Sequence, residues 1–130
     1  MRLIREFMAA LQLLLEGKDL EHRREELKKL YEQYIGPYEL YHNATIDVAM
    51  RALASYDEGQ RLERMEMLAE LYYAEADTVT GPDRNFLLDK AFNLFAFIEQ
   101  NGKTFSMDRR YKMGLIEQRL KKCSGKTRCE

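Results

Sequence analysis

The sequence predicts an all-α protein of about six helices in three antiparallel hairpins. The chain of 130 residues contains only two Pro, and most of its seven Gly stand between segments of helical periodicity. No stretch alternates Val, Ile and Thr in the manner of a half-buried strand. The segment FLLDKAFNLFAFIEQ, from Phe86 to Gln100, is apolar on most sides of a helical wheel. Because such a helix needs neighbours on most sides, we expect it to be the central core helix.

The other helices are predicted from apolar periodicity and from residues that begin and end helices. Gly17 and Gly36-Pro37 are typical of helix ends, and Asp19 and Ser106 are typical of helix starts. Residues 77–85 form the longest expected loop and the best candidate for a mobile segment. The expected helices cover residues 2–16, 20–35, 44–56, 60–76, 86–100 and 107–122.

These helices are expected to form one domain over residues 1–122, followed by a flexible basic tail at 123–130. The pattern leaves open whether the helices stack as in a repeat protein or close into a compact bundle. Charged residues make up 33% of the chain, but the formal net charge is only −1. This balance argues against a protein dedicated to nucleic acid or to membrane surfaces.

The two ends of the chain indicate a cytoplasmic protein. Gln12 and Glu16 interrupt the apolar start of the chain, and no small-residue cleavage site follows, so we expect a packed helix rather than a signal peptide. Cys123 and Cys129 both lie in the last eight residues. This placement favours reduced thiols over a secreted disulfide scaffold, with a disulfide or metal clip in the tail as the alternative.

Few residues suggest catalysis or metal binding. Glu39-Leu40-Tyr41-His42 has the spacing with which di-iron bundles place a carboxylate and an imidazole on one helix face. The nearest second pair, Asp19 with His22, would lie about 25 Å away along an intact helix, too far to share a metal. Gly102-Lys103-Thr104 and Ser124-Gly125-Lys126-Thr127 lack the upstream glycine of a phosphate loop. We therefore expect no catalytic, metal-binding or cofactor-binding residues, and no cofactor.

Two sets of residues are candidate partner-binding surfaces. The first is tyrosines spaced 3, 4 and 3 apart, which either bind a partner or cover one end of the core: Tyr31, Tyr34, Tyr38 and Tyr41. The second is the acidic stripe Glu63, Glu66, Glu70 and Asp77, in a segment of net charge −5, whereas residues 105–130 carry +5. The acids face a partner, or Arg109, Arg110 and Lys112 of the same chain, or solvent.

The first helix is a candidate for self-association. Its apolar side chains cover a wide arc, and Leu13 projects outside it. A terminal helix this apolar would pair readily with its copy in a homodimer. The residues expected to contribute are Leu3, Phe7, Leu11, Leu13 and Leu14.

Parts of the sequence resemble known helical proteins. Leu68-Ala69-x-x-Tyr72 and Ala91-x-x-x-Phe95 resemble the small-and-large pattern of tetratricopeptide repeats, which implies closely crossing helices that bind peptide segments. The chain as a whole is similar to small uncharacterised bacterial helical proteins, through LLLEGK, AFNLFAFIE and FSMDRRYKMGLIEQRL. That resemblance implies a helical fold and a bacterial cytoplasmic origin.

The function predicted from these features is a non-catalytic protein–protein interaction or scaffold module that self-associates. The alternative is a small-molecule sensor or minor enzyme, with a pocket beside Phe92, Phe95 and the 77–85 loop.

Overall fold

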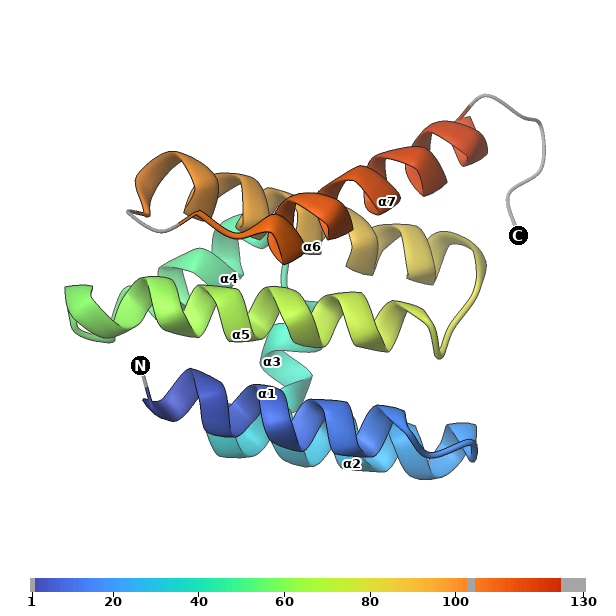
Figure 1. Ribbon diagram of the computed structural model, residues 1–130, viewed down its shortest axis with the longest axis horizontal. Helices are drawn as coiled ribbons and strands as arrows, with labels where there is room; N and C mark the ends of the chain where they lie inside the picture. Colours follow the sequence, from blue (N-terminus) through green and yellow to red (C-terminus); the bar gives the residue numbers. More distant parts are fainter. Residues whose placement is uncertain (1, 103–104, 125–130) are drawn as a thin grey trace.

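The computed structural model of the chain (Figure 1) describes residues 2–102 and 105–124, and every regular element in them is a helix. The prediction of an all-α protein is confirmed. No helix among the described residues combines the length and the hydropathy needed to cross a bilayer. The helices are α1 (Arg2–Leu15), α2 (Leu20–Tyr34), α3 (Tyr38–Asn43), α4 (Ile46–Leu53), α5 (Glu58–Ala76), α6 (Gly81–Asn101) and α7 (Met107–Ser124).

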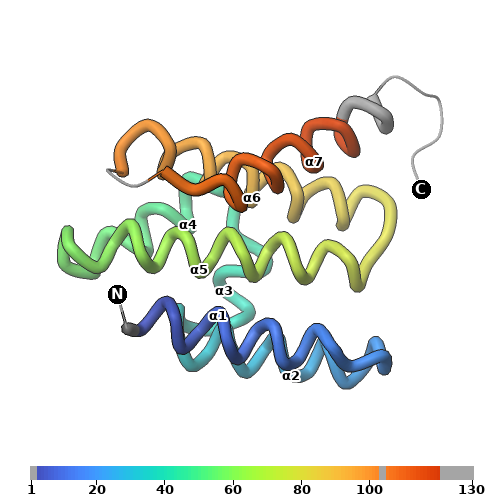
Figure 2. The backbone as a smooth tube through the Cα atoms, in the orientation of Figure 1, coloured from blue at the N-terminus to red at the C-terminus, as the bar shows by residue number. Residues whose placement is uncertain are grey.

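The helices lie in layers, which Figures 1 and 2 show from the same side. The α1–α2 hairpin forms one layer, α5 runs through the middle, and α6 with α7 forms the opposite layer. The short helices α3 and α4 connect the first layer to the rest. The core is therefore one continuous cluster of apolar side chains rather than a series of separate ones.

The hub of the fold is α5 rather than the predicted central segment in α6. α5 packs against α1, α2, α4 and α6, and ten of its residues are buried, against seven in α6. Glu70 and Glu75 of α5 are acidic but buried, so the sequence of α5 suggested a solvent-exposed face that the helix does not have. The segment 86–100 is helical and mostly buried as predicted, but Phe86 is 41% exposed and Lys90 is buried.

Two local predictions differ from the structure. Residues 77–85 do not form a long loop, because α6 begins at Gly81 and leaves only four connecting residues. Pro82 occupies the first turn of α6, where its missing N–H costs no hydrogen bond, so Gly-Pro starts this helix instead of breaking the chain. Helix α3 was not predicted, because its six residues are too few to show a period.

Cationic side chains from neighbouring elements cap the C-terminal ends of five helices. Arg23 donates to Leu15 O and Gly17 O after α1, at 3.2 and 2.6 Å. The α1, α2 and α5 helices have no basic residue in their own last turns. The remaining caps are Arg64 at Tyr34 O of α2, Lys90 at the end of α3, Arg61 at Ala54 O and Tyr56 O after α4, and Arg24 at Thr78 O after α5. Each cation satisfies free carbonyls and opposes the negative end of a helix dipole.

The predicted tail at 123–130 lies mostly outside the described residues. Cys123 and Ser124 belong to the last turn of α7, and residues 125–130, including Cys129, are not described. The Lys103-Thr104 part of the first phosphate-loop-like fragment also falls outside them.

Candidate functional site

The acidic stripe of α5 faces α7 of the same chain. Of the three arrangements that the sequence left open, the structure shows the intramolecular one for Glu66, Glu70 and Asp77. Their partners are Arg109 at 3.2 Å, Lys112 at 2.7 Å and Arg119 at 3.2 Å, respectively. These ion pairs hold α7 on the hub helix, so the stripe is a structural seam.

Arg109 is the most enclosed member of this seam, with a side chain only 1% exposed. It donates from Nε to Glu99 of α6 at 2.6 Å and from Nη1 to Glu66 of α5 at 3.2 Å, and thereby joins three helices. Arg110 adds a second, more exposed contact to Glu99 at 3.0 Å. Burial of Glu70 raises the pKa of its carboxyl group even though Lys112 opposes the shift.

Glu63 has a different role from its neighbours on the stripe. Its carboxylate accepts the backbone N–H of Ile4 at 3.0 Å, in the first turn of α1. A carboxylate at this end of a helix satisfies a free N–H and is favoured by the helix dipole. Glu63 therefore ties α1 to α5.

The tyrosine cluster lies at the junction of α2, α3 and α5. Tyr31, Tyr34 and Tyr41 are buried, and Tyr38 is half-buried. Tyr31 donates to Glu75 at 2.7 Å and Tyr38 donates to the same carboxylate at 2.5 Å. The rings cover the end of the core, which was the alternative to a partner-binding surface.

Glu75 also meets His42, whose Nδ1 lies 2.8 Å from one carboxylate oxygen. The imidazole stacks on the Tyr38 ring, with centroids 4.9 Å apart. In this position His42 pairs with α5 and does not combine with Glu39 of its own helix as a di-iron motif would. Among the described residues, no three His, Cys, Asp or Glu side chains are grouped so as to hold a metal.

Lys90 of α6 is a buried cation in an otherwise mostly apolar helix. Its Nζ donates to the carbonyls of Tyr41, His42 and Ala44 at 3.2, 3.0 and 2.8 Å. It also lies 4.2 Å from the Tyr72 ring centroid. Burial lowers its pKa to about 8, because the charged amine loses water. All of these contacts stabilise α3, so the cluster is structural.

The predicted self-association arc of α1 is largely occupied by the core. Phe7 and Leu11 are buried, and Leu3 and Leu14 are partly covered. Among these predicted residues only Leu13, at 71%, is strongly exposed. The arc packs within the chain, which leaves little of it for a second copy.

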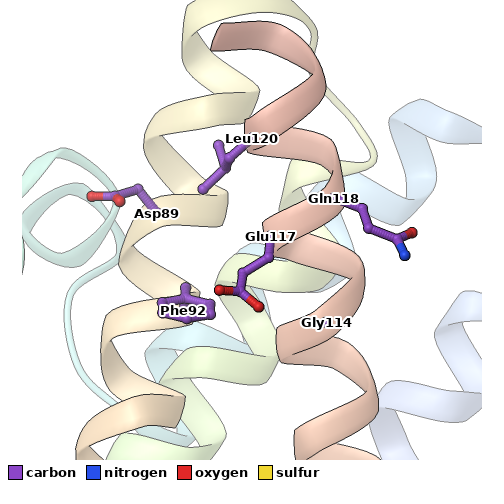
Figure 3. Close-up of a pocket in the computed structure, with 6 residues that line it drawn as sticks. All are labelled: Asp89, Phe92, Gly114, Glu117, Gln118 and Leu120. Atoms are coloured by element: carbon purple, nitrogen blue, oxygen red, sulfur yellow. The ribbon is translucent and has the colours of Figure 1, made fainter. Parts of the chain in front are cut away.

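A shallow hollow of about 550 Å³ lies between α6 and α7. Figure 3 shows the Glu117 carboxylate beside the Phe92 ring and Leu120 reaching toward α6. Asp89 and Gln118 extend outward at its edges (Figure 3). Phe92 was expected beside a pocket, but Phe95 is fully buried in the core and neither it nor residues 77–85 line this hollow.

Three strongly exposed large apolar side chains lie just before α7 and in its first two turns. Phe105, Met107 and Tyr111 are 64%, 75% and 67% exposed. The Arg110 guanidinium lies 4.7 Å from the Phe105 ring centroid. This surface was not predicted from the sequence, because α7 has no continuous apolar stripe and its outer face is defined only by how the helix packs in the folded chain.

Comparison with known proteins leaves the function to be argued from these surfaces. No protein-family model, no curated protein and no solved structure matches the chain. The resemblances to tetratricopeptide repeats and to small bacterial helical proteins remain expectations. The candidate functional site is therefore the outer face of α7 together with the adjoining α6–α7 hollow.

Proposed function

We propose that the protein is a non-catalytic helical module of the bacterial cytoplasm that acts through protein–protein contact and self-associates. The observation that carries the proposal is the exposure of Phe105, Met107 and Tyr111 on one short stretch. Apolar side chains gathered on a surface are typical of protein interfaces, and Tyr and Met are enriched there. The contact surface is the outer face of α7, because the α1 arc is mostly buried.

The oligomeric state tests this proposal directly. Sedimentation or light scattering from low to high micromolar concentration is expected to show the mass rising from 15.4 kDa toward that of two chains. Tyr111→Lys should prevent the rise, whereas Leu13→Lys, an equally exposed position on α1, should not. A wild-type chain that stays monomeric throughout would overturn the proposal, and a reversed effect of the two variants would return the interface to α1.

The second candidate function is small-molecule binding in the α6–α7 hollow. Its size and the Phe92 ring on its wall support this alternative. In a thermal-shift screen of metabolites, a true ligand at 100 times its dissociation constant adds about 2.7 kcal/mol to stability. Phe92→Ala should abolish that shift, and Phe97→Ala, outside the hollow, should preserve it. A screen without shifts would exclude this candidate.

A further inference from the structure

The outer face of α7 has the spacing of a helix-pairing seam. Met107, Tyr111, Gly114 and Gln118 follow one another at intervals of 4, 3 and 4 residues, the spacing of core positions in a coiled coil. Met107, Tyr111 and Gln118 are exposed, and none of the four carries a charge. The inner face of α7 is already used, since Arg109 and Ile116 are buried against the rest of the chain.

Gly114 has no packing role within the chain. A Cβ atom built at this position meets no other heavy atom within 4 Å, apart from its own helix backbone and chain neighbours. Glycine weakens a helix interior, so its presence here is unexplained by the folded monomer. A glycine at a core position of a pairing seam leaves a recess for a large side chain from the opposite helix.

We propose that α7 pairs antiparallel with α7 of a second copy, with Tyr111 of each chain packed over Gly114 of the other. In an antiparallel pair, core positions of the two types alternate across the seam, which sets Tyr111 opposite Gly114 and Met107 opposite Gln118. A parallel pair would instead face Tyr111 with Tyr111 and leave a gap at Gly114. This inference names the surface of the proposed self-association and therefore rests on it.

Charge complementarity supports the same orientation. Arg110 and Glu117 are seven residues apart and flank the seam on the same side of α7. Antiparallel pairing brings each Arg110 beside Glu117 of the second copy and gives two equivalent ion pairs. In the parallel arrangement Arg110 would face the apolar Leu115 and this complementarity would be lost.

The hollow gives each Arg110 a place to bind. Glu117 lies on the α7 side of the hollow and the Phe92 ring lies beside it (Figure 3). Within the described residues, the Glu117 side chain takes part in no hydrogen bond or ion pair. The Arg110 guanidinium of the second copy would exchange its exposed contacts with Glu99 and Phe105 of its own chain for a carboxylate and an aromatic face there, which is a favourable combination for arginine.

The expected dimer is small and reversible. From Met107 to Gln118 the seam is about 16 Å long, and one helix from each chain contributes to it. An interface of this size belongs to the small class of protein contacts, so the dimer should form only with increasing concentration. This property suits a charge-exchange experiment, because the copies mix freely.

Arg110→Glu and Glu117→Arg test the pairing with the full chain. Each variant alone places like charges together in its own dimer and should raise the dimer dissociation constant at least tenfold, by sedimentation equilibrium. An equimolar mixture of the two restores both pairs in a heterodimer, which should form within threefold of the wild-type constant. Glu25→Arg, an exposed reversal on α2, is the matched control and should dimerise as the wild type.

Gly114→Leu is the second test and does not depend on charge. Because space is open around Gly114, the variant should fold with its helical content intact while losing the dimer at least tenfold. If the wild type dimerises but neither the reversals nor Gly114→Leu affects it, the α7 pairing is wrong while self-association stands. If the wild type never dimerises, both proposals are overturned.

Discussion

Lys112 of α7 donates to Glu70 of α5 at 2.7 Å, and the Glu70 side chain is only 4% exposed. The same ammonium group contacts Asp108 one helical turn earlier at 2.9 Å. Burial lowers the tendency of Lys112 to be charged, but Glu70 and Asp108 outweigh it and raise its pKa. An acid that lies in the interior of the fold is therefore neutralised by a residue 42 positions later in the sequence.

Removing Lys112 should destabilise the protein more than removing an exposed lysine. Lys112→Met leaves the Glu70 carboxylate buried without its partner, and we expect a loss of about 2–4 kcal/mol at pH 7 by urea unfolding. The loss should shrink toward pH 5, because the raised pKa of Glu70 lets the carboxyl group take up a proton. Lys29→Met, which removes a 72% exposed partner of Glu26, should have no measurable effect.

A double variant distinguishes the cost of leaving Glu70 unpaired from the cost of losing the lysine side chain itself. Glu70→Met combined with Lys112→Met removes both charges, so stability should recover most of what Lys112→Met loses. A double variant as unstable as Lys112→Met would show that packing of the lysine stem, and not the unpaired acid, causes the loss.

Lys90 should make stability rise with pH over a defined window. Its pKa is about 8 in the folded protein against 10.5 in the unfolded chain, so between these values the unfolded chain binds more protons. The free energy of unfolding should therefore increase from pH 7.5 to 9.5, by about 1–2 kcal/mol. Unfolding curves of Lys90→Met should lack this increase, although the variant starts from lower stability. If the free energy of unfolding rose equally with pH in the wild type and in Lys90→Met, Lys90 would not be the group responsible.

Two glycines should respond in opposite ways to alanine. Gly114→Ala should raise the stability of the monomer by about 1 kcal/mol, since alanine favours a helix and the site is open. Gly36→Ala should lower it by more than about 1 kcal/mol, because the new Cβ would lie 2.8 Å from Cε2 of Tyr41 at a φ of +157°. Thermal unfolding at low micromolar concentration measures both. If both variants changed the stability in the same direction, helix propensity rather than the space around each glycine would determine the effect.

The sequence predicted helices better than it predicted their neighbours. Apolar periodicity and caps such as Asp19 act within a few residues, so most helix positions could be predicted from the sequence. The Gly81-Pro82 pair was misread because it is compatible with both a break and a helix start. The choice between them depends on what the first turn of α6 packs against.

The roles of the charged residues could not be predicted in the same way. Glutamate is usually a surface residue, so the sequence did not indicate that Glu70 and Glu75 are buried. Their burial depends on partners from other helices: Lys112 for Glu70, and Tyr31, Tyr38 and His42 for Glu75. Of the four tyrosines whose spacing suggested a partner-binding surface, three are buried. The sequence did raise the pairing of the acidic stripe with Arg109 and Lys112, because opposite charges stood on different helices.

By itself, the sequence determined that this chain forms helices and approximately where most of them begin and end, because caps, turns and periodicity are local properties. The tertiary structure alone decided that α5 is the hub, that cations from other helices cap helix C-termini, and that α7 exposes an uncharged stripe flanked by Arg110 and Glu117. Burial and charge pairing join residues far apart in the chain, so their outcome is fixed only when the helices pack.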